Sequence, residues 1–181
     1  MGMPKNSKLK NNKIKVIIFI FFLFWALLHF IIPLLLPANI ITDLSGVVGL
    51  EDNEHLTNNL PFPSRLVYKL GDIMCHQKAE RSFFINGNQM PFCSRCTGIF
   101  LGLSIGLMIV IFKKLRLDGK FIILLIAAFV PIGIDGIGQL FGFWKSNNLI
   151  RVITGLSAGI VCGIAIGLIV DEVTATFISK K

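Results

Sequence analysis

Four long runs of apolar residues dominate the chain, and shorter polar segments separate them. The runs cover residues 16–36, 92–112, 121–143 and 152–170. Each run approaches the roughly 20 apolar residues that a helix needs to cross a bilayer. We therefore predict an all-α integral membrane protein with four transmembrane helices. The first run is too long for a signal peptide and no cleavage site follows it, so we expect it to remain as an anchor.

The polar segments between the runs differ in length and character. Residues 1–15 form a basic N-terminus, 113–120 and 144–151 are short loops, and 171–181 is a tail. The long segment 37–91 includes "EDNEHLTNNLPFP", which we expect to be irregular because it is polar and rich in proline. Later in this segment Leu66, Leu70, Ile73 and Met74 recur at helical spacing. We predict a short amphipathic helix there, lying on the outer mouth of the bundle.

Composition and charge agree with a membrane location. Hydrophobic residues make up 54% of the chain and charged residues 15%, and the mean hydropathy is +0.74, unlike a soluble domain. The net charge is +8, but the lysines gather in blocks beside apolar runs, so we expect lipid and no nucleic acid as the partner. The positive-inside rule then places both termini and residues 113–120 in the cytoplasm, and 37–91 and 144–151 outside a cell membrane.

The second and fourth runs share a glycine pattern. Glycine recurs at every fourth residue, at Gly98, Gly102 and Gly106 in one run and at Gly155, Gly159, Gly163 and Gly167 in the other. Each run also begins with an arginine followed by Thr-Gly. Such stripes let two helix backbones approach closely. We predict that the second span packs against the fourth, as matching halves of two helical hairpins.

Cysteine and histidine gather at the start of the second run. Cys93 and Cys96 form a C-x-x-C pair, and Cys75 and His76 precede them by roughly 17 residues. Three sulfurs and one imidazole nitrogen are a ligand set of tetrahedral zinc sites. Neighbouring side chains on a helix point about 100° apart, so Cys75 and His76 can share an ion only at a helix end or turn. We predict that these four residues bind zinc at the outer mouth of the bundle.

Two other uses of these cysteines stay open at this point. Cys93 and Cys96 suit a membrane thiol oxidoreductase that exchanges electrons with a quinone, and Arg95 between them would favour the thiolate. Alternatively, Cys75 forms a plain disulfide with one member of the pair, as is common outside the cytoplasm. The sequence does not decide whether the protein is an enzyme.

A second cluster of polar residues falls within or beside the apolar runs. Asp135 and Gln139 lie one helical turn apart in the third run, among Pro131 and several glycines, so we expect this span to be broken or kinked. Arg81, Arg95 and Arg151 offer planar donors for an anionic small or lipid-like ligand. The alternatives are that Asp135 neutralises one arginine and locks the bundle, or that the broken span belongs to a small transporter.

Several short motifs together resemble a known family. "CHQ" followed by "ERSF", then "CSRCTGIFLG", "GIDGIGQLFG" and "NNLIRVITG", is similar to an uncharacterised family of predicted prokaryotic membrane proteins (DUF2085-like). The resemblance covers residues 63–159. It implies a membrane location and the type of fold, and it carries no activity. The polar stretch 42–59 matches no part of the family pattern.

Overall fold

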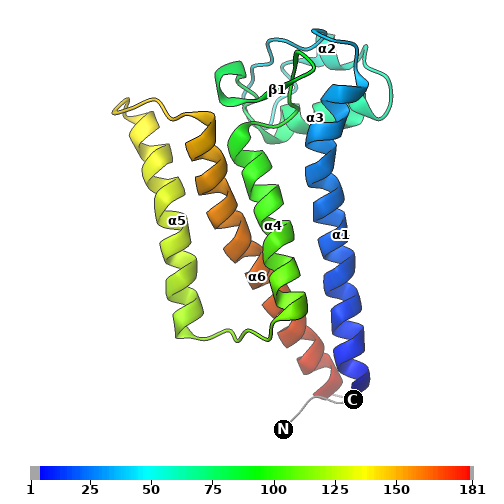
Figure 1. Ribbon diagram of the computed structural model, residues 1–181, viewed down its shortest axis with the longest axis vertical. Helices are drawn as coiled ribbons and strands as arrows, with labels where there is room; N and C mark the ends of the chain where they lie inside the picture. Colours follow the sequence, from blue (N-terminus) through cyan, green and yellow to red (C-terminus); the bar gives the residue numbers. More distant parts are fainter. Residues whose placement is uncertain (1–4, 180–181) are drawn as a thin grey trace.

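The computed structural model describes residues 5–179, with side chains described for residues 12–176. Most of it consists of four long helices, namely α1 (Lys5–Leu35), α4 (Ser94–Phe112), α5 (Gly119–Leu140) and α6 (Asn148–Ser179) (Figure 1). Each contains a stretch of 19 to 29 residues that is long and apolar enough to cross a membrane. The predicted fold class, an all-α membrane protein with four spanning helices, is confirmed.

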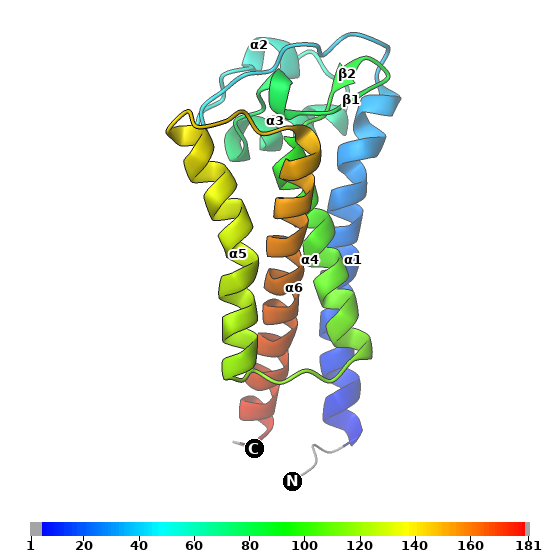
Figure 2. The same cartoon turned by 60° about the vertical axis from the view of Figure 1, so that its left-hand side comes forward.

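α4 and α6 form the centre of the helix bundle. α1 packs mainly against α4, and α5 packs against α6. Figures 1 and 2 show α1 and α5 running towards one end of the bundle and α4 and α6 running back. The loop 113–118, the start of α1 and the end of α6 therefore lie at one end of the bundle. Residues 36–93, which we call the cap, lie at the other end, as does the loop 141–147.

Glycines allow the close approach of α4 and α6. A Cβ added at Gly102 would lie 2.5 Å from the Leu156 carbonyl oxygen and 2.8 Å from the Gly159 Cα. A Cβ at Gly98 would lie 2.6 Å from the Val152 carbonyl oxygen. Since real Cβ atoms do not approach backbone this closely, only glycine fits at these positions. The predicted packing of the second span against the fourth is confirmed.

The cap is built from short elements around its own apolar core. It contains α2 (Glu54–Thr57), α3 (Ser64–Met74), the 3-10 turn η1 (Ala79–Arg81) and an antiparallel hairpin of β1 (Phe84–Ile85) and β2 (Asn88–Gln89). Asn86 and Gly87 have φ angles of 54° and 71° and make the two-residue hairpin turn. The core joins the end of α1 to the cap through Ile32, Leu36, Ile41, Leu44, Leu60, Val67 and Tyr68.

The predicted amphipathic helix exists as α3, but its buried face is not the predicted one. Leu66 is 50% exposed and Met74 53% exposed, and Ile73 is also exposed. The buried face instead carries Val67, Tyr68, Gly71 and Asp72, among others. Polar contacts explain the difference, because the Tyr68 hydroxyl donates to the Gln89 carbonyl (2.6 Å) and Asp72 accepts from Asn53.

We expected the third span to be broken or kinked, and the structure shows that it is not broken. α5 is one continuous helix that includes Pro131. Proline lacks the backbone donor for the preceding turn, but neighbouring helices re-satisfy such groups in transmembrane bundles. The carbonyl left without a helical donor is that of Ala127, and the next carbonyl, that of Ala128, accepts a hydrogen bond from the Ser157 hydroxyl of α6 (3.4 Å). The local sequence alone does not reveal this contact.

Candidate metal centre

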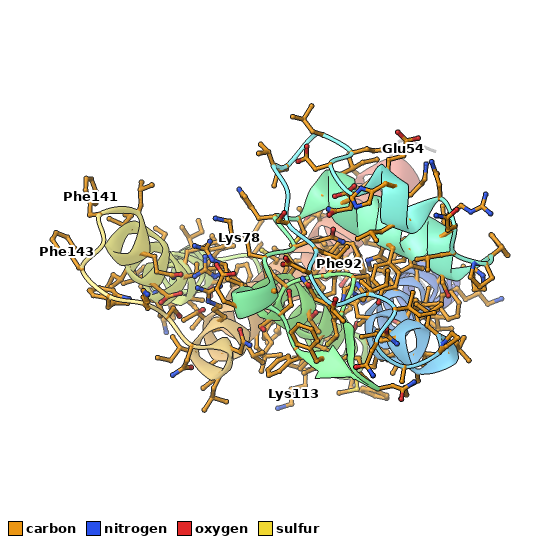
Figure 3. All side chains as sticks on the ribbon, turned by 90° about the horizontal axis from the view of Figure 1, so that it is seen from above. Glu54, Lys78, Phe92, Lys113, Phe141 and Phe143 are labelled. Carbon is orange, nitrogen blue, oxygen red and sulfur yellow. The ribbon has the colours of Figure 1, made fainter. Side chains whose placement is uncertain are left out.

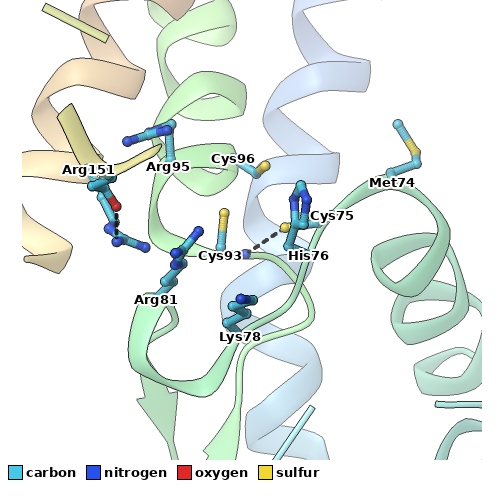
Figure 4. Close-up of a pocket in the computed structure, with 10 residues that line it drawn as sticks. Met74, Cys75, His76, Lys78, Arg81, Cys93, Arg95, Cys96 and Arg151 are labelled. Atoms are coloured by element: carbon cyan, nitrogen blue, oxygen red, sulfur yellow. Dashed lines mark hydrogen bonds between the residues drawn. The ribbon is translucent and has the colours of Figure 1, made fainter. Parts of the chain in front are cut away.

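Three cysteine sulfurs converge where the cap meets the bundle. The Sγ atoms of Cys75, Cys93 and Cys96 all lie within 4.8 Å of one another. Figure 4 shows them at the centre of a cavity, with arginines on one side and His76 on the other. His76 directly follows Cys75, is exposed and lines the same cavity, but it is not part of this close group. Cys162 lies elsewhere, in the middle of α6.

Two helix ends place these thiols. Cys93 is the N-cap residue of α4, with extended backbone, and Cys96 follows one turn along the helix. Cys75 is the C-cap residue of α3 and is also extended. The Cys93 backbone N–H donates to the Cys75 sulfur (3.4 Å), which ties the two helix ends directly (Figure 4). The requirement that Cys75 and His76 lie at a helix end is therefore met.

Gln77 holds the end of α3 against the start of α4. Its side-chain amide is fully buried and donates to the Pro91 carbonyl (2.6 Å). Gly71 of α3 faces the same point, since a Cβ there would collide with the Pro91 carbonyl oxygen and the Gln77 amide. Gln77 also has a positive φ of 43°, which turns the chain sharply after His76. This contact sets the distance between Cys75 and the C-x-x-C pair.

The thiols perturb one another strongly. Hydrogen bonds from Cys75 and Cys96 to the Cys93 sulfur lower the pKa of Cys93, which precedes the α4 span. The hydrogen bond to Cys93, together with burial, raises the pKa of Cys75 to about 11. Cys93 at a helix N-terminus is thus the thiol best suited to ionise first, because the helix dipole also favours negative charge there.

A cavity of about 150 Å³, which we call the arginine cavity, adjoins the sulfurs. It is lined by Met74, Cys75, His76, Lys78, Arg81, Cys93, Arg95, Cys96, Gln139 and Arg151. Four of the five residues predicted for ligand binding are therefore on its wall. The fifth, Asp135, does not line the cavity, but it accepts hydrogen bonds from two residues that do, Arg95 and Gln139.

Asp135 anchors the wall of the arginine cavity. Its carboxylate accepts from the Arg95 guanidinium, from the Gln139 amide (2.9 Å) and from the Trp144 indole (3.4 Å). Gln139 in turn accepts a hydrogen bond from Arg151. Asp135 therefore joins α4, α5 and α6 at the cap end. This agrees with the alternative in which Asp135 neutralises one arginine and holds the helices of the bundle together.

Sequence reasoning missed several residues that build this region. Lys78 lines the cavity and lies on the side of the cap that faces α5 when the molecule is seen from above (Figure 3). Asn88 and Gln89 are buried and bond the hairpin to the chain after α1, with Asn88 accepting from the Ile40 and Ile41 N–H groups. The Asn-Gly pair at 86–87 is a strong sequence signal for a β-hairpin, and it could have predicted this part of the cap.

The fold and the site define a multi-pass helical membrane protein with a cysteine cluster at one end of its bundle. The chain belongs to the family described as predicted membrane protein (DUF2085), whose model matches residues 75–167. The predicted family is thus confirmed, and the match spans the cysteine cluster and both glycine stripes.

Two similar archaeal proteins are named only as uncharacterised proteins. A protein of Methanocaldococcus jannaschii is 41% identical over 107 residues, covering 57% of this chain and 67% of its own length. A protein of Methanothermobacter thermautotrophicus is 40% identical over 87 residues, covering 48% of this chain and 78% of its own length. No solved structure matches the chain.

Proposed function

We propose that Cys75, Cys93 and Cys96 bind one zinc ion, with His76 as the fourth ligand. The observation that supports this is the convergence of three sulfurs within 4.8 Å from two separate helix ends. Thiolates and imidazole are the ligands that zinc prefers in structural sites. His76 is next to Cys75 and on the wall of the same cavity, so a side-chain rotation is the adjustment that the proposal requires.

The proposed zinc site has a structural role. Four protein ligands leave no open position for an activated water, so the ion would not itself be catalytic. Its task would be to fasten the cap onto the start of α4, where the Ser94 hydroxyl already donates to the Arg81 carbonyl (3.0 Å) and the Cys93–Cys75 and Gln77–Pro91 hydrogen bonds hold the adjoining segment. Metal binding would then contribute free energy to folding, because the unfolded chain has no preformed site.

The fastened cap completes a polar pocket for an anionic small or lipid-like ligand. Arg81 comes from η1 of the cap, whereas Arg95 and Arg151 come from α4 and α6. All three line the arginine cavity together with Gln139, and Asp135 holds this wall in place. We place the protein in the cell membrane with the cap outside and both termini in the cytoplasm, on the basis of the lysine distribution.

A membrane thiol oxidoreductase is the second candidate. The observation that favours it is the position of Cys93 at the N-cap of α4 with a lowered pKa. In this reaction Cys93 and Cys96 would form a disulfide, and two electrons and two protons would pass to a quinone and reduce it to quinol. The transporter alternative was based on a broken third span and on a possible duplication of the helical hairpin, and the continuity of α5 removes the first of these two supports.

Metal analysis of the purified full chain under reducing conditions tests the zinc proposal. We expect about one zinc per chain, measured by plasma mass spectrometry, and its loss in Cys93→Ser and Cys96→Ser. Cys162→Ser is the matched control and should keep its zinc, because Cys162 is outside the cluster. His76→Ala should release zinc faster to a chelator. A metal-free chain with a Cys93–Cys96 disulfide that quinone regenerates would favour the oxidoreductase instead.

A further inference from the structure

Three arginines around the arginine cavity have buried donors without partners. Arg151 is only 5% exposed, and its guanidinium donates a hydrogen bond to the neutral amide of Gln139. Within residues 12–176, the Nε atoms of Arg81, Arg95 and Arg151 are buried and have no hydrogen-bond partner, and the Arg81 Nε has only a longer ion-pair contact with the Glu80 carboxylate (3.6 Å). A buried donor left unpaired is costly, more so when it belongs to a charged group. These donors therefore point to a ligand that supplies acceptor atoms.

Charge also favours an anion in the cavity. Four cationic side chains line it, those of Lys78, Arg81, Arg95 and Arg151. The carboxylates in ion pairs with them are Asp135, which pairs with Arg95, and Glu80, 3.6 Å from Arg81. One zinc ion with three thiolates and a neutral histidine would add a single negative charge. One positive charge then remains to be neutralised.

We propose that the arginine cavity binds a phosphate group of single negative charge, as in the phosphodiester of a membrane lipid. This inference rests on the proposed zinc site for its charge count. Arginine forks match phosphate oxygens well. The three arginines reach the cavity from η1, α4 and α6, and a tetrahedral phosphate offers oxygens in several directions, whereas the two oxygens of a carboxylate lie in one plane.

The size and edge of the cavity favour a lipid as the source of this phosphate. Its volume of about 150 Å³ is roughly ten times what one water requires, which suits a headgroup but not acyl chains. Met74 lines the cavity and is half exposed, at the end of the exposed apolar face of α3. In Figure 4 the Met74 side chain points along α4, away from the cap. Acyl chains would thus find apolar surface at the cavity edge.

Calorimetric titration of the detergent-purified full chain tests the proposal. The probes are dioctanoyl phosphatidylglycerol, dioctanoyl phosphatidylcholine and inorganic phosphate. We expect saturable binding of phosphatidylglycerol, at least about 10-fold tighter than the zwitterionic lipid, because only the former carries a net negative charge. Tighter binding of inorganic phosphate would identify free phosphate as the source. Binding of none of the three would overturn the proposal.

Three variants locate the binding. Arg151→Gln should weaken phosphatidylglycerol binding about 10- to 100-fold, the usual effect of losing hydrogen bonds to a charged group. If that variant fails to fold, Arg81→Gln, on the cap, should give a similar loss. Arg116→Gln is the matched control, since Arg116 is exposed in the loop at the opposite end of the bundle. Equal weakening in Arg116→Gln would mean unspecific attraction and would overturn the proposal.

Zinc content measured on the same samples separates the two proposals. If the chain contains zinc but binds none of the three probes, the result contradicts the phosphate site and leaves the zinc site unaffected. A chain without zinc whose phosphatidylglycerol binding still depends on Arg151 contradicts the zinc site alone. The phosphate site would then be supported by the unpaired arginine donors alone, and the net charge of the cavity would have to be counted without zinc.

Discussion

The distance between the cysteines depends on residues that carry no sulfur. Gly71 and Gln77 meet the Pro91 carbonyl, and this contact sets α3 beside the segment that leads into α4. Gln77 is fully buried, and its carbonyl accepts a hydrogen bond from Gln89 of the hairpin. The buried Nε2 donor of Gln77 and its backbone carbonyl are both paired, which favours this geometry, since moving α3 would leave these groups without partners. The cluster is therefore held by the cap before any metal binds.

Gly71→Ala tests this dependence. The new Cβ would collide with the Pro91 carbonyl oxygen, so α3 would have to move away and Cys75 would leave the other two sulfurs. We expect a loss of about 1–3 kcal/mol of stability, typical of overpacking, seen as a lower melting temperature, together with loss of bound zinc. Gly133→Ala is the control, because nothing lies within 4 Å of its Cβ position. Unchanged zinc content in Gly71→Ala would contradict this account.

At the scale of elements, α4 and α6 are joined by backbone contact. Leu156 and Gly159 of α6 lie against Gly102, and Ile99 of α4 lies against Gly159. Apolar side chains gain little from association inside lipid, so close packing of small residues is what drives such helices together. α4 carries Cys93, Cys96 and Arg95, and α6 carries Arg151, so this contact also fixes one side of the arginine cavity.

Gly102→Leu should separate α4 from α6. A leucine at this position would overlap the Leu156 carbonyl and the Gly159 backbone, and the helices would have to part by more than a side-chain rotation allows. We expect a clearly reduced yield of folded protein in detergent, measured by size-exclusion chromatography. Gly119→Leu is a suitable control, since open space surrounds Gly119. Equal yields for both variants would show that the glycine stripe does not hold the bundle.

Hydropathy and small-residue spacing were sufficient to predict the helices and their central pair, because both depend on local composition. The face of α3 was not predictable in this way, since Tyr68 and Asp72 are buried by contacts with Gln89 and Asn53, which are remote in sequence. The continuity of α5 through Pro131 was likewise not evident from the local sequence, in which proline and glycine indicate a break. The cysteine motif predicted a cluster, but the placement of His76 beside it follows from the turn at Gln77.

At the scale of the whole molecule, the two ends of the bundle differ in chemistry. The cap end carries the thiols and the arginine cavity. The other end carries the loop 113–118, the start of α1 and the end of α6 (Figure 1), and there Lys15 of α1 is buried and pairs with Asp171 of α6 at 3.0 Å. Such a pair ties the first and last spans at their shared end. The lysine-rich start of α1 and the loop 113–118 both lie on this side, which the positive-inside rule would assign to the cytoplasm.

Labelling of intact cells with a membrane-impermeant maleimide decides the orientation. We expect Glu54→Cys in the cap to be labelled directly, and Lys114→Cys in the loop 113–118 to be labelled only after permeabilisation. Both positions are exposed, and the unmodified chain provides the background from its own cysteines, of which Cys75 is buried. The opposite result would place the cluster in a reducing compartment. Stable disulfides are rare there, so a structural disulfide at Cys75 would be excluded, and zinc, which needs reduced thiolates, would gain support.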